Sequence, residues 1–228
     1  MIQRPLILKQ MEINPIIDWS NTSQWEKVYS PSTDTFFLCD GLKSVSENIP
    51  NFSQILEVGC GSGYVTAYCS RLLKSLGKHS IHFATDFNFE CCKVTAKTCY
   101  ENNVMVMPIN DNFFNSIKGK IDVVIFNPPY VETPDDELED AIKKHGIEAS
   151  WAGGEDGAVV IYDFLNFINN NRSKLSNNFM IVLLISRVNR PRKLKRFCSN
   201  NGLDFKIILE KNCQGESLKI VLITPTVE

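Results

Sequence analysis

The residues Asn127-Pro128-Pro129-Tyr130 place a hydrogen-bonding amide where a buried strand has to stop. The run 121–126 before them is apolar and rich in β-branched residues, which is typical of a buried strand. Two prolines then end the strand, because proline has no N–H to donate to a neighbouring strand. Ligands of open α/β sheets bind at the carboxyl ends of the strands. We therefore expect Asn127 to face a ligand.

A glycine-rich turn marks a second position of this kind. The apolar run 55–58, which contains Glu57, predicts a strand, and 64–76 predicts a helix. Glycines in the turn let a ligand approach the backbone, and the first N–H groups of the helix point at it. The glycines are Gly59, Gly61 and Gly63.

Two aspartates end the next two predicted strands. Asp86 follows the run 81–85, and its carboxylate could accept both hydroxyl protons of a ribose diol. It could equally cap the helix predicted through 91–100, and only its pairing with the glycine turn favours a ligand. Asp111 ends the third strand, 104–111. In a sheet of order 3-2-1 this strand lies at an edge, so we expect a helix or a partner protein to cover it.

The remaining elements predict a single α/β domain over 28–228, with 1–27 as an N-terminal extension in which 16–19 could form a short helix or cap. The acidic segment 133–144 is predicted to be mobile and solvated, and 145–157 to be a glycine-rich loop. The basic run 187–196 is either a solvated face or a contact to RNA phosphate or an acidic partner. Further predicted helices begin at Ser32 or Thr33 and cover 158–169 and 189–200, and further strands cover 179–185, 204–209 and 217–223.

Composition excludes several classes of protein. With 228 residues and a net charge of −2, the chain has no strong nucleic-acid signal. Its eight cysteines form no C-x-x-C pair and only three histidines are present, so no metal site is expected. Scattered cysteines indicate reduced, buried thiols. No apolar stretch is long enough to span a membrane and no signal peptide is visible, so we expect a cytoplasmic or nuclear protein.

The order of these features resembles the class I S-adenosyl-L-methionine-dependent methyltransferases. The resemblance implies a Rossmann-like, seven-stranded, mostly parallel doubly wound sheet of order 3-2-1-4-5-7-6, with helices on both faces. It implies that Glu57 and Gly59 line the methionine half of the cofactor, Asp86 its ribose and Asp111 its adenine amine. The full set of cofactor-binding residues that it implies is Thr35, Glu57, Gly59, Gly61, Gly63, Asp86, Asp111, Asn112 and Asn127.

Asn127 to Tyr130 is similar to the motif of methyltransferases that act on a nitrogen conjugated to a π system. Such a nitrogen is a poor nucleophile, because its lone pair is delocalised. The Asn127 side-chain oxygen and the Pro128 carbonyl can each accept one N–H, which would hold the lone pair toward the methyl group and stabilise charge growing on nitrogen. Tyr130 could stack on the flat substrate. The catalytic residues implied are Asn127, Pro128, Pro129 and Tyr130.

Two further stretches are similar to HemK-like glutamine methyltransferases of the eukaryotic and archaeal type. They are residues 28–36, although Ser30 stands where the family has glutamate, and the loop 145–154. That family methylates the glutamine of the Gly-Gly-Gln motif in the class I translation release factor. It pairs with a small zinc-binding activator, and the resemblance places this heterodimer contact at the edge strand 104–109. The substrate-loop residues that it implies are His145, Trp151, Gly153 and Gly154, with His145 as a structural hydrogen-bond donor.

Other functions share part of this pattern. Adenine-N6 methylation of DNA or RNA would use the same tetrapeptide, but with a target-recognition region and a basic face. Lysine methylation of a protein, such as a histone, would need a deprotonated amine. A nicotinamide-dependent oxidoreductase would carry G-x-G-x-x-G rather than the G-x-G-x-G found here. A non-catalytic scaffold would not need the tetrapeptide.

Overall fold

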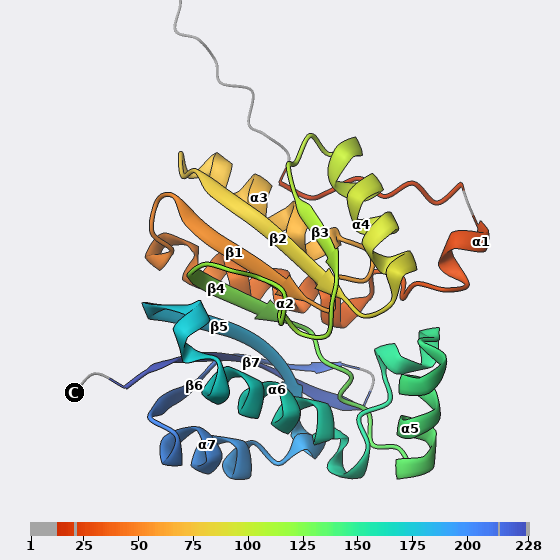
Figure 1. Ribbon diagram of the computed structural model, residues 1–228, viewed down its shortest axis with the longest axis vertical. Coiled ribbons are helices and arrows are strands. Elements are labelled where there is room, and N and C mark those ends of the chain that lie inside the picture. The colour runs from red at the N-terminus through yellow and green to blue at the C-terminus, as the bar shows by residue number, and fades with distance from the viewer. Residues whose placement is uncertain (1–12, 21, 214, 227–228) are drawn as a thin grey trace, which may run out of the picture.

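The computed structural model describes residues 13–20, 22–213 and 215–226 and contains one sheet of seven strands. Their order is β3-β2-β1-β4-β5-β7-β6, which confirms the predicted topology (Figure 1). Only β7 is antiparallel to its neighbours β5 and β6. The strands are β1 (Ser53–Val58), β2 (Ser80–Asp86), β3 (Met107–Asn110), β4 (Ile121–Phe126), β5 (Leu175–Ser186), β6 (Leu203–Cys213) and β7 (Glu216–Pro225).

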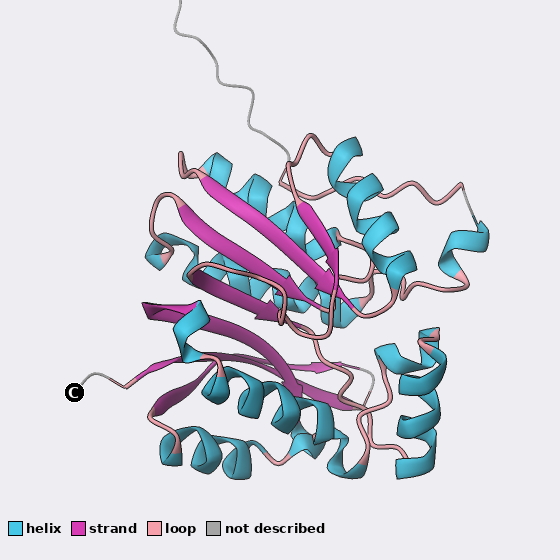
Figure 2. Cartoon of the chain, viewed as in Figure 1, coloured by secondary structure: helices cyan, strands magenta, loops and turns pink. Residues whose placement is uncertain are grey.

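Helices cover both faces of this sheet (Figures 1 and 2). One face packs against α2 (Thr33–Val45) and α3 (Tyr64–Ser75), and α4 (Phe89–Glu101) lies next to α3. The other face packs against α6 (Val159–Asn170) and α7 (Pro191–Asn200). The central strands β1 and β4 are buried almost throughout, as expected for parallel strands covered on both sides.

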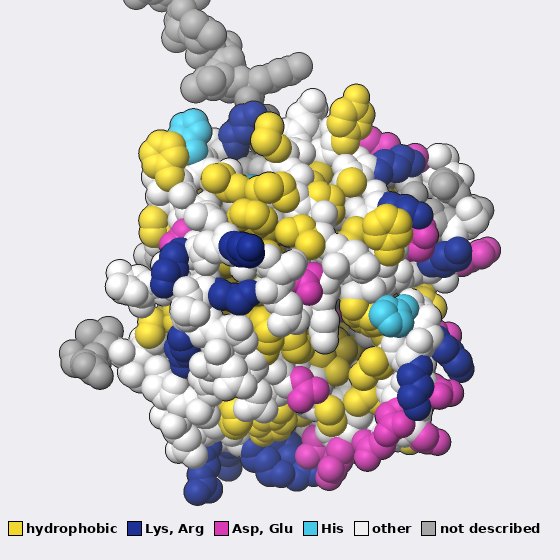
Figure 3. All heavy atoms as spheres, viewed as in Figure 1, with side chains coloured by type: hydrophobic (Ala, Val, Ile, Leu, Met, Phe, Trp, Pro, Cys, Tyr) yellow, Lys and Arg dark blue, Asp and Glu magenta, His cyan; other side chains and the backbone are white. Residues whose placement is uncertain are grey.

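The face of β2 and β3 opposite α3 and α4 carries no helix (Figure 2). Residues 111–120, all of which the structure describes, join β3 to β4 without forming one. Ile81 and Met107 are consequently 51% and 44% exposed. Hydrophobic side chains gather on this part of the surface in Figure 3. On its other face β3 packs against α4, so of the two covers considered for the edge strand the helix is present on one face and, among the described residues, absent from this one.

The segment 133–144 corrects one prediction, because most of it is a helix, α5 (Asp135–Lys144). Its Leu138 side chain is buried beside the chain that follows the helix. Lysines pair with acids four residues earlier, Lys143 with Glu139 and Lys144 with Asp140. Such pairs stabilise a helix by about 0.3–0.5 kcal/mol each. The charges indicated a solvated segment, but their spacing suits one side of a helix.

The N-terminal segment lies along α4. Ile16 donates its N–H to the Asn102 side chain and accepts from it in return, at 2.8 and 2.7 Å. Residues 16–19 form no helix, and the short helix α1 lies later, at Thr22–Trp25. The predicted boundary at residue 28 remains a prediction. Among the described residues, no helix has both the length and the apolar character needed to cross a bilayer.

Candidate active site

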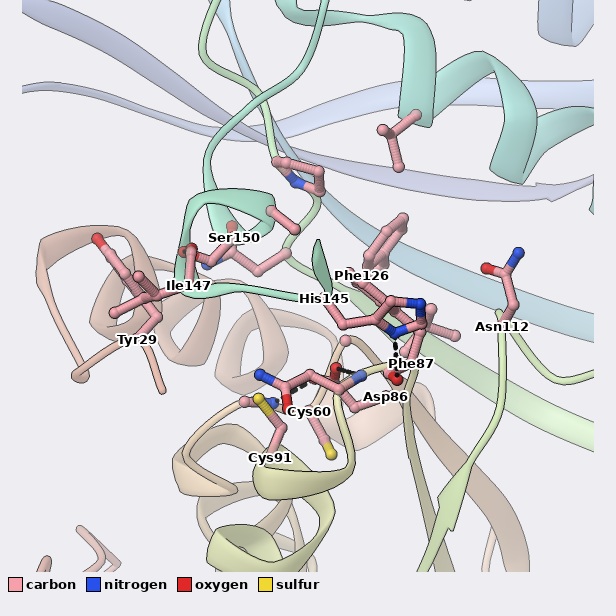
Figure 4. A pocket seen from close by; sticks show the side chains of 18 of the residues that line it. Tyr29, Cys60, Asp86, Phe87, Cys91, Asn112, Phe126, His145, Ile147 and Ser150 are labelled. Carbon is pink, nitrogen blue, oxygen red and sulfur yellow. Dashed lines mark hydrogen bonds between the residues drawn. The ribbon is translucent and has the colours of Figure 1, made fainter. Parts of the chain in front are cut away.

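A cavity of about 400 Å³ opens at the carboxyl ends of β1, β2 and β4 and is closed on one side by the loop after α5 (Figure 4). The structure brings together ten of the predicted site residues around it. They are Thr35, Glu57, Gly59, Gly61, Asp86, Asp111, Asn112, Asn127, Pro129 and His145. Features far apart in the sequence therefore meet in one place, as parallel strands that end at one edge require.

Asp86 joins the glycine turn to the loop after β2. Its two oxygens accept from the backbone N–H groups of Gly61 at 3.0 Å and Asn88 at 2.9 Å. The N-cap of α4 is Asn88, whose side chain accepts from Glu90 N–H at 3.0 Å. The alternative that Asp86 caps this helix is therefore wrong. Burial raises the pKa of Asp86, and the two N–H bonds oppose that shift.

Glu57 is buried at the end of β1 and lines the cavity. It accepts a short hydrogen bond from the hydroxyl of Thr66 on α3. Burial raises the pKa of Glu57 to about 8, although the Thr66 bond acts in the opposite direction. Burial thus favours the protonated form of this carboxyl group, and a cation beside it would favour the carboxylate.

The glycine turn has the backbone conformation that glycine favours. Gly63, which precedes α3, has φ +74°, and a Cβ there would lie 2.7 Å from the Cα of Thr95. Gly63 does not line the cavity, so its role is to bring the two helices together. At the other end of the cavity, Asp111 accepts from the Ser116 N–H and hydroxyl, both at 2.7 Å. Figure 4 shows Asn112 on that side.

The Asn127 side chain is held in one orientation by Asp34 on α2. Its amide nitrogen donates to the Asp34 carboxylate at 3.0 Å. A carboxylate only accepts, so the nitrogen of Asn127 must face Asp34. The amide oxygen is buried and has no hydrogen-bond partner. A buried acceptor without a donor costs about 1–3 kcal/mol, which an N–H of a bound molecule would recover.

The loop 145–157 runs beside the tetrapeptide. Val131 N–H donates to Trp151 at 3.0 Å, and Gly153 N–H donates back to Val131 at 2.8 Å. These bonds form a short parallel bridge between Val131 and Ala152. The loop is thus fixed to the chain that leaves β4, which places it next to Asn127.

His145 fastens the start of this loop to the opposite wall of the cavity. It ends α5 with φ +50°, and its Nδ1 lies 3.1 Å from the Phe87 carbonyl. A carbonyl oxygen only accepts, so Nδ1 donates, which is the structural hydrogen bond expected of His145. Its ring also packs against the Phe87 ring at 5.0 Å (Figure 4).

Several predicted residues lie outside the cavity wall. Tyr130 is half-buried against the core on the α2 side, and burial raises its pKa. Trp151 packs with residues of α5. At Gly153 a Cβ would lie 2.8 Å from the Val131 carbonyl, so this glycine permits close backbone packing. The residues that the cavity lining does not include are Gly63, Pro128, Tyr130, Trp151, Gly153 and Gly154.

The far end of the loop meets the chain that follows β5. Asp156 and Arg190 form an ion pair, and their φ values are +56° and +49°. Between them, the fully buried Asn189 bonds to the backbone of three segments. Positive φ in residues with a Cβ is uncommon and carries a cost. Here it occurs at two residues that tie the loop 145–157 to the chain after β5, and neither is part of the cavity lining.

Sequence reasoning missed Asp34 and Asn189, although both act directly on the tetrapeptide. Asp34 was visible only as part of a helix start, and Asn189 as one residue of a basic run. Cavity-lining Tyr29 and Phe87 were also missed. An apolar residue directly after Asp86 was a signal that could have indicated Phe87. In the described part of the chain, no three His, Cys, Asp or Glu side chains gather as a metal site would require.

This sheet order, with a cavity at its carboxyl edge, defines a class I methyltransferase fold. The model of the methyltransferase small domain family matches residues 37–183. Methyltransferase HEMK2 of Homo sapiens is 31% identical over 201 residues, which cover 86% of this chain and 89% of the human protein. The chain therefore belongs to the HemK-like methyltransferases with this small domain.

Two further relatives are informative. The eRF1 methyltransferase catalytic subunit mtq2 of Schizosaccharomyces pombe is 26% identical over 224 residues, covering 92% of this chain and 94% of the yeast protein. The E. cuniculi Mtq2–Trm112 complex, responsible for methylation of the eRF1 translation termination factor, has a chain of similar fold. Its TM-score is 0.61 at 23% identity, covering 88% of this chain and 99% of that one.

Proposed function

We propose that this chain methylates the side-chain amide of a glutamine in a class I translation release factor, at the Gly-Gly-Gln motif. The observation that carries the proposal is the Asn127 amide, which Asp34 fixes by its nitrogen and whose buried oxygen has no partner. A primary amide supplies the N–H that this oxygen lacks. Two relatives, an eRF1 methyltransferase and a release factor glutamine methyltransferase, support the same substrate.

The cavity fits S-adenosyl-L-methionine by the chemistry of its lining. That molecule offers three donor groups, namely an ammonium, a ribose diol and an adenine amine. Carboxylates end three successive strands around the cavity, at Glu57, Asp86 and Asp111. We assign them to these groups in that order. Phe87 and Phe126 give the apolar walls that an adenine and a methionine chain would contact.

The residues of this chain would act on the acceptor by positioning it. When bound, the cofactor supplies an electrophilic methyl group. Asn127 and the Pro128 carbonyl would each accept one N–H of the glutamine amide, which orients the nitrogen lone pair. The same acceptors would stabilise the positive charge that grows on nitrogen as the new bond forms. The amide proton becomes acidic only after methyl transfer, so no general base is needed before it.

The exposed face of β2 and β3 is the proposed site of a small activator subunit. Met107 and Ile81 are exposed there, and Met105, just before β3, is 90% exposed. The edge of β3 offers unpaired backbone groups for strand addition. The Mtq2–Trm112 complex of E. cuniculi supports an assembly of two chains. A zinc-binding activator is the expected partner.

The decisive experiment is methyl transfer from labelled cofactor to recombinant release factor, using the chain co-expressed with the activator. Label should appear on the wild-type factor and be absent from a factor whose motif glutamine is changed to alanine. Equal labelling of both factors would contradict a glutamine acceptor. Asn127→Ala should abolish transfer and leave the affinity for S-adenosylhomocysteine largely unchanged. If that affinity collapsed too, the assignment of Asn127 to the acceptor would be wrong.

A further inference from the structure

A single buried asparagine, Asn189, connects the catalytic turn, residues 127–130, to the substrate loop, residues 145–157. It follows β5 and is 0% exposed. Its amide nitrogen donates to the backbone carbonyl of Tyr130 at 2.9 Å. The same nitrogen contacts the carbonyls of Asp156 at 3.0 Å and Gly157 at 2.8 Å. Its oxygen accepts from Ser186 N–H at 2.6 Å.

These contacts use the whole side chain. An asparagine amide has two N–H hydrogens, which three carbonyls share here, and an oxygen that Ser186 occupies. No other residue type of this size offers a donor and an acceptor with this geometry. The carbonyls belong to residues 130, 156 and 157, so one side chain joins two segments that are far apart in the sequence.

The backbone at the junction is built around the same contact. Gly157 has φ +58°, and a Cβ on it would lie 2.1 Å from the Tyr130 carbonyl oxygen and 2.8 Å from the Asn189 amide nitrogen. The loop therefore approaches the catalytic turn as closely as a glycine allows. Beyond the junction, the bond from Val131 N–H to the Trp151 carbonyl and the bond from Gly153 N–H to the Val131 carbonyl continue the attachment between the two segments.

We infer that Asn189 is a positioning residue for the acceptor amide: it fixes the Asn127–Tyr130 turn against the loop 145–157 and so sets the width of the acceptor pocket. The Pro128 carbonyl lies two residues before the Tyr130 carbonyl that Asn189 holds. A shift of the turn moves both hydrogen-bond acceptors, the Asn127 oxygen and the Pro128 carbonyl, relative to the methyl donor. This inference rests on the proposed function for the identity of the acceptor, but its structural content does not depend on it.

Asn189→Ala should lower kcat/KM for the release factor by about 10²-fold, the cost of an acceptor misplaced by about 1 Å. The affinity for S-adenosylhomocysteine should change less than about threefold, because the contacts of Asn189 lie on the acceptor side. Asn102→Ala is the matched control. Asn102 is also a buried asparagine, and its side chain makes three hydrogen bonds, two with Ile16 and one to Thr98, at the C-terminal end of α4. Asn102→Ala should lower the free energy of unfolding without the fall in kcat/KM.

Two further variants keep the test decisive if Asn189→Ala does not fold. Asn189→Ser keeps one donor in a smaller side chain and should lower kcat/KM less than alanine does. In Gly157→Ala the added Cβ displaces the loop from Tyr130 while Asn189 is unchanged. This variant should show the same fall in kcat/KM for the release factor. A folded Asn189→Ala variant, or a folded Gly157→Ala variant, with kcat/KM within about threefold of wild type would overturn the inference.

Amide hydrogen exchange separates this inference from the substrate assignment. Without any substrate, Asn189→Ala should speed exchange in peptides that contain Val131 and Gly153, and Asn102→Ala should speed it at Ile16 instead. If the wild-type chain fails to methylate the release factor, the proposed substrate is wrong. In that case faster exchange at Val131 and Gly153 still supports the role of Asn189, and unchanged exchange there overturns it.

Discussion

Asp34→Asn tests whether a carboxylate is needed to orient the Asn127 amide. In the native chain Asp34 can only accept, so the Asn127 nitrogen faces it at 3.0 Å and the oxygen stays available to the acceptor. The amide introduced by the substitution offers both a donor and an acceptor, so either end of the Asn127 amide can face it. If the single oxygen of the introduced amide keeps accepting from Thr35 N–H, which Asp34 holds at 2.8 Å, the start of α2 remains intact and the introduced nitrogen faces Asn127, which favours the turned Asn127 amide.

The size of the effect follows from the lost charge. A hydrogen bond to a charged group contributes about 1.5–3 kcal/mol and a neutral one about 0.5–1.5 kcal/mol. The difference of about 1.4 kcal/mol corresponds to about a tenfold fall in kcat/KM. Asp34→Ala leaves the Asn127 nitrogen without its partner, which costs up to about 3 kcal/mol, so the fall should approach about 10²-fold.

The assay measures labelled methyl transfer to the release factor at limiting substrate, beside calorimetric titration with S-adenosylhomocysteine. The transfer rate should fall while the dissociation constant of the cofactor product changes less than about threefold. A loss of cofactor affinity of about tenfold, with kcat unchanged at saturation, would refute the reasoning. So would an Asp34→Asn variant as active as the native chain.

Four other predictions follow from the site and the sheet. Cofactor affinity should rise about fivefold from pH 7 to pH 8, because Glu57, whose pKa is about 8, must lose its proton to pair with an ammonium. In titration calorimetry the affinity of Glu57→Gln should stay constant over this pH range. Because burial raises that pKa in the folded state, wild-type stability should also fall relative to Glu57→Gln as pH rises from about 4.5 to about 8, which urea unfolding at several pH values can measure. Met107→Glu should abolish co-purification with the activator, whereas Val188→Glu, at a residue of similar exposure (45% against 44%), should not; retained binding by Met107→Glu would place the activator elsewhere. Gly63→Ala should lower the free energy of unfolding by about 2 kcal/mol or more, because alanine disfavours this positive φ and its Cβ would clash with Thr95. Gly77 has φ +71° but open space around it, so Gly77→Ala should lower the free energy of unfolding by only about 1 kcal/mol in the same urea titration.

Much of the fold was predictable because residues with special backbone or side-chain chemistry stand at the strand ends. Glycines after β1, Asp86 after β2 and Asn127 after β4 each interrupt an apolar run, so strands and their carboxyl ends could be located together. Parallel topology then brought these residues to one cavity. Neither step required knowledge of how side chains pack.

The contacts that orient the site were not predictable in this way. The Asp34–Asn127 bond spans 93 positions and the Asn189–Tyr130 bond spans 59, so no local pattern indicates either pair. α5 was missed for another reason, since its many charges concealed the helical spacing of Leu138, Ala141 and Ile142. Only the first two of these are buried, which makes the apolar side of the helix narrow.

The residues with left-handed backbone at the cavity and at the loop beside it create a trade-off between thermal stability and catalytic rate. Phe113, His145, Asp156 and Arg190 hold positive φ although each has a Cβ, at a cost of about 1 kcal/mol or more apiece. Glycine at these positions would relieve that cost, so a search for heat-resistant variants should find them early. Yet His145 would lose its hold on Phe87, and the Asp156–Arg190 pair would be broken. Added stability at these positions should therefore reduce catalytic output.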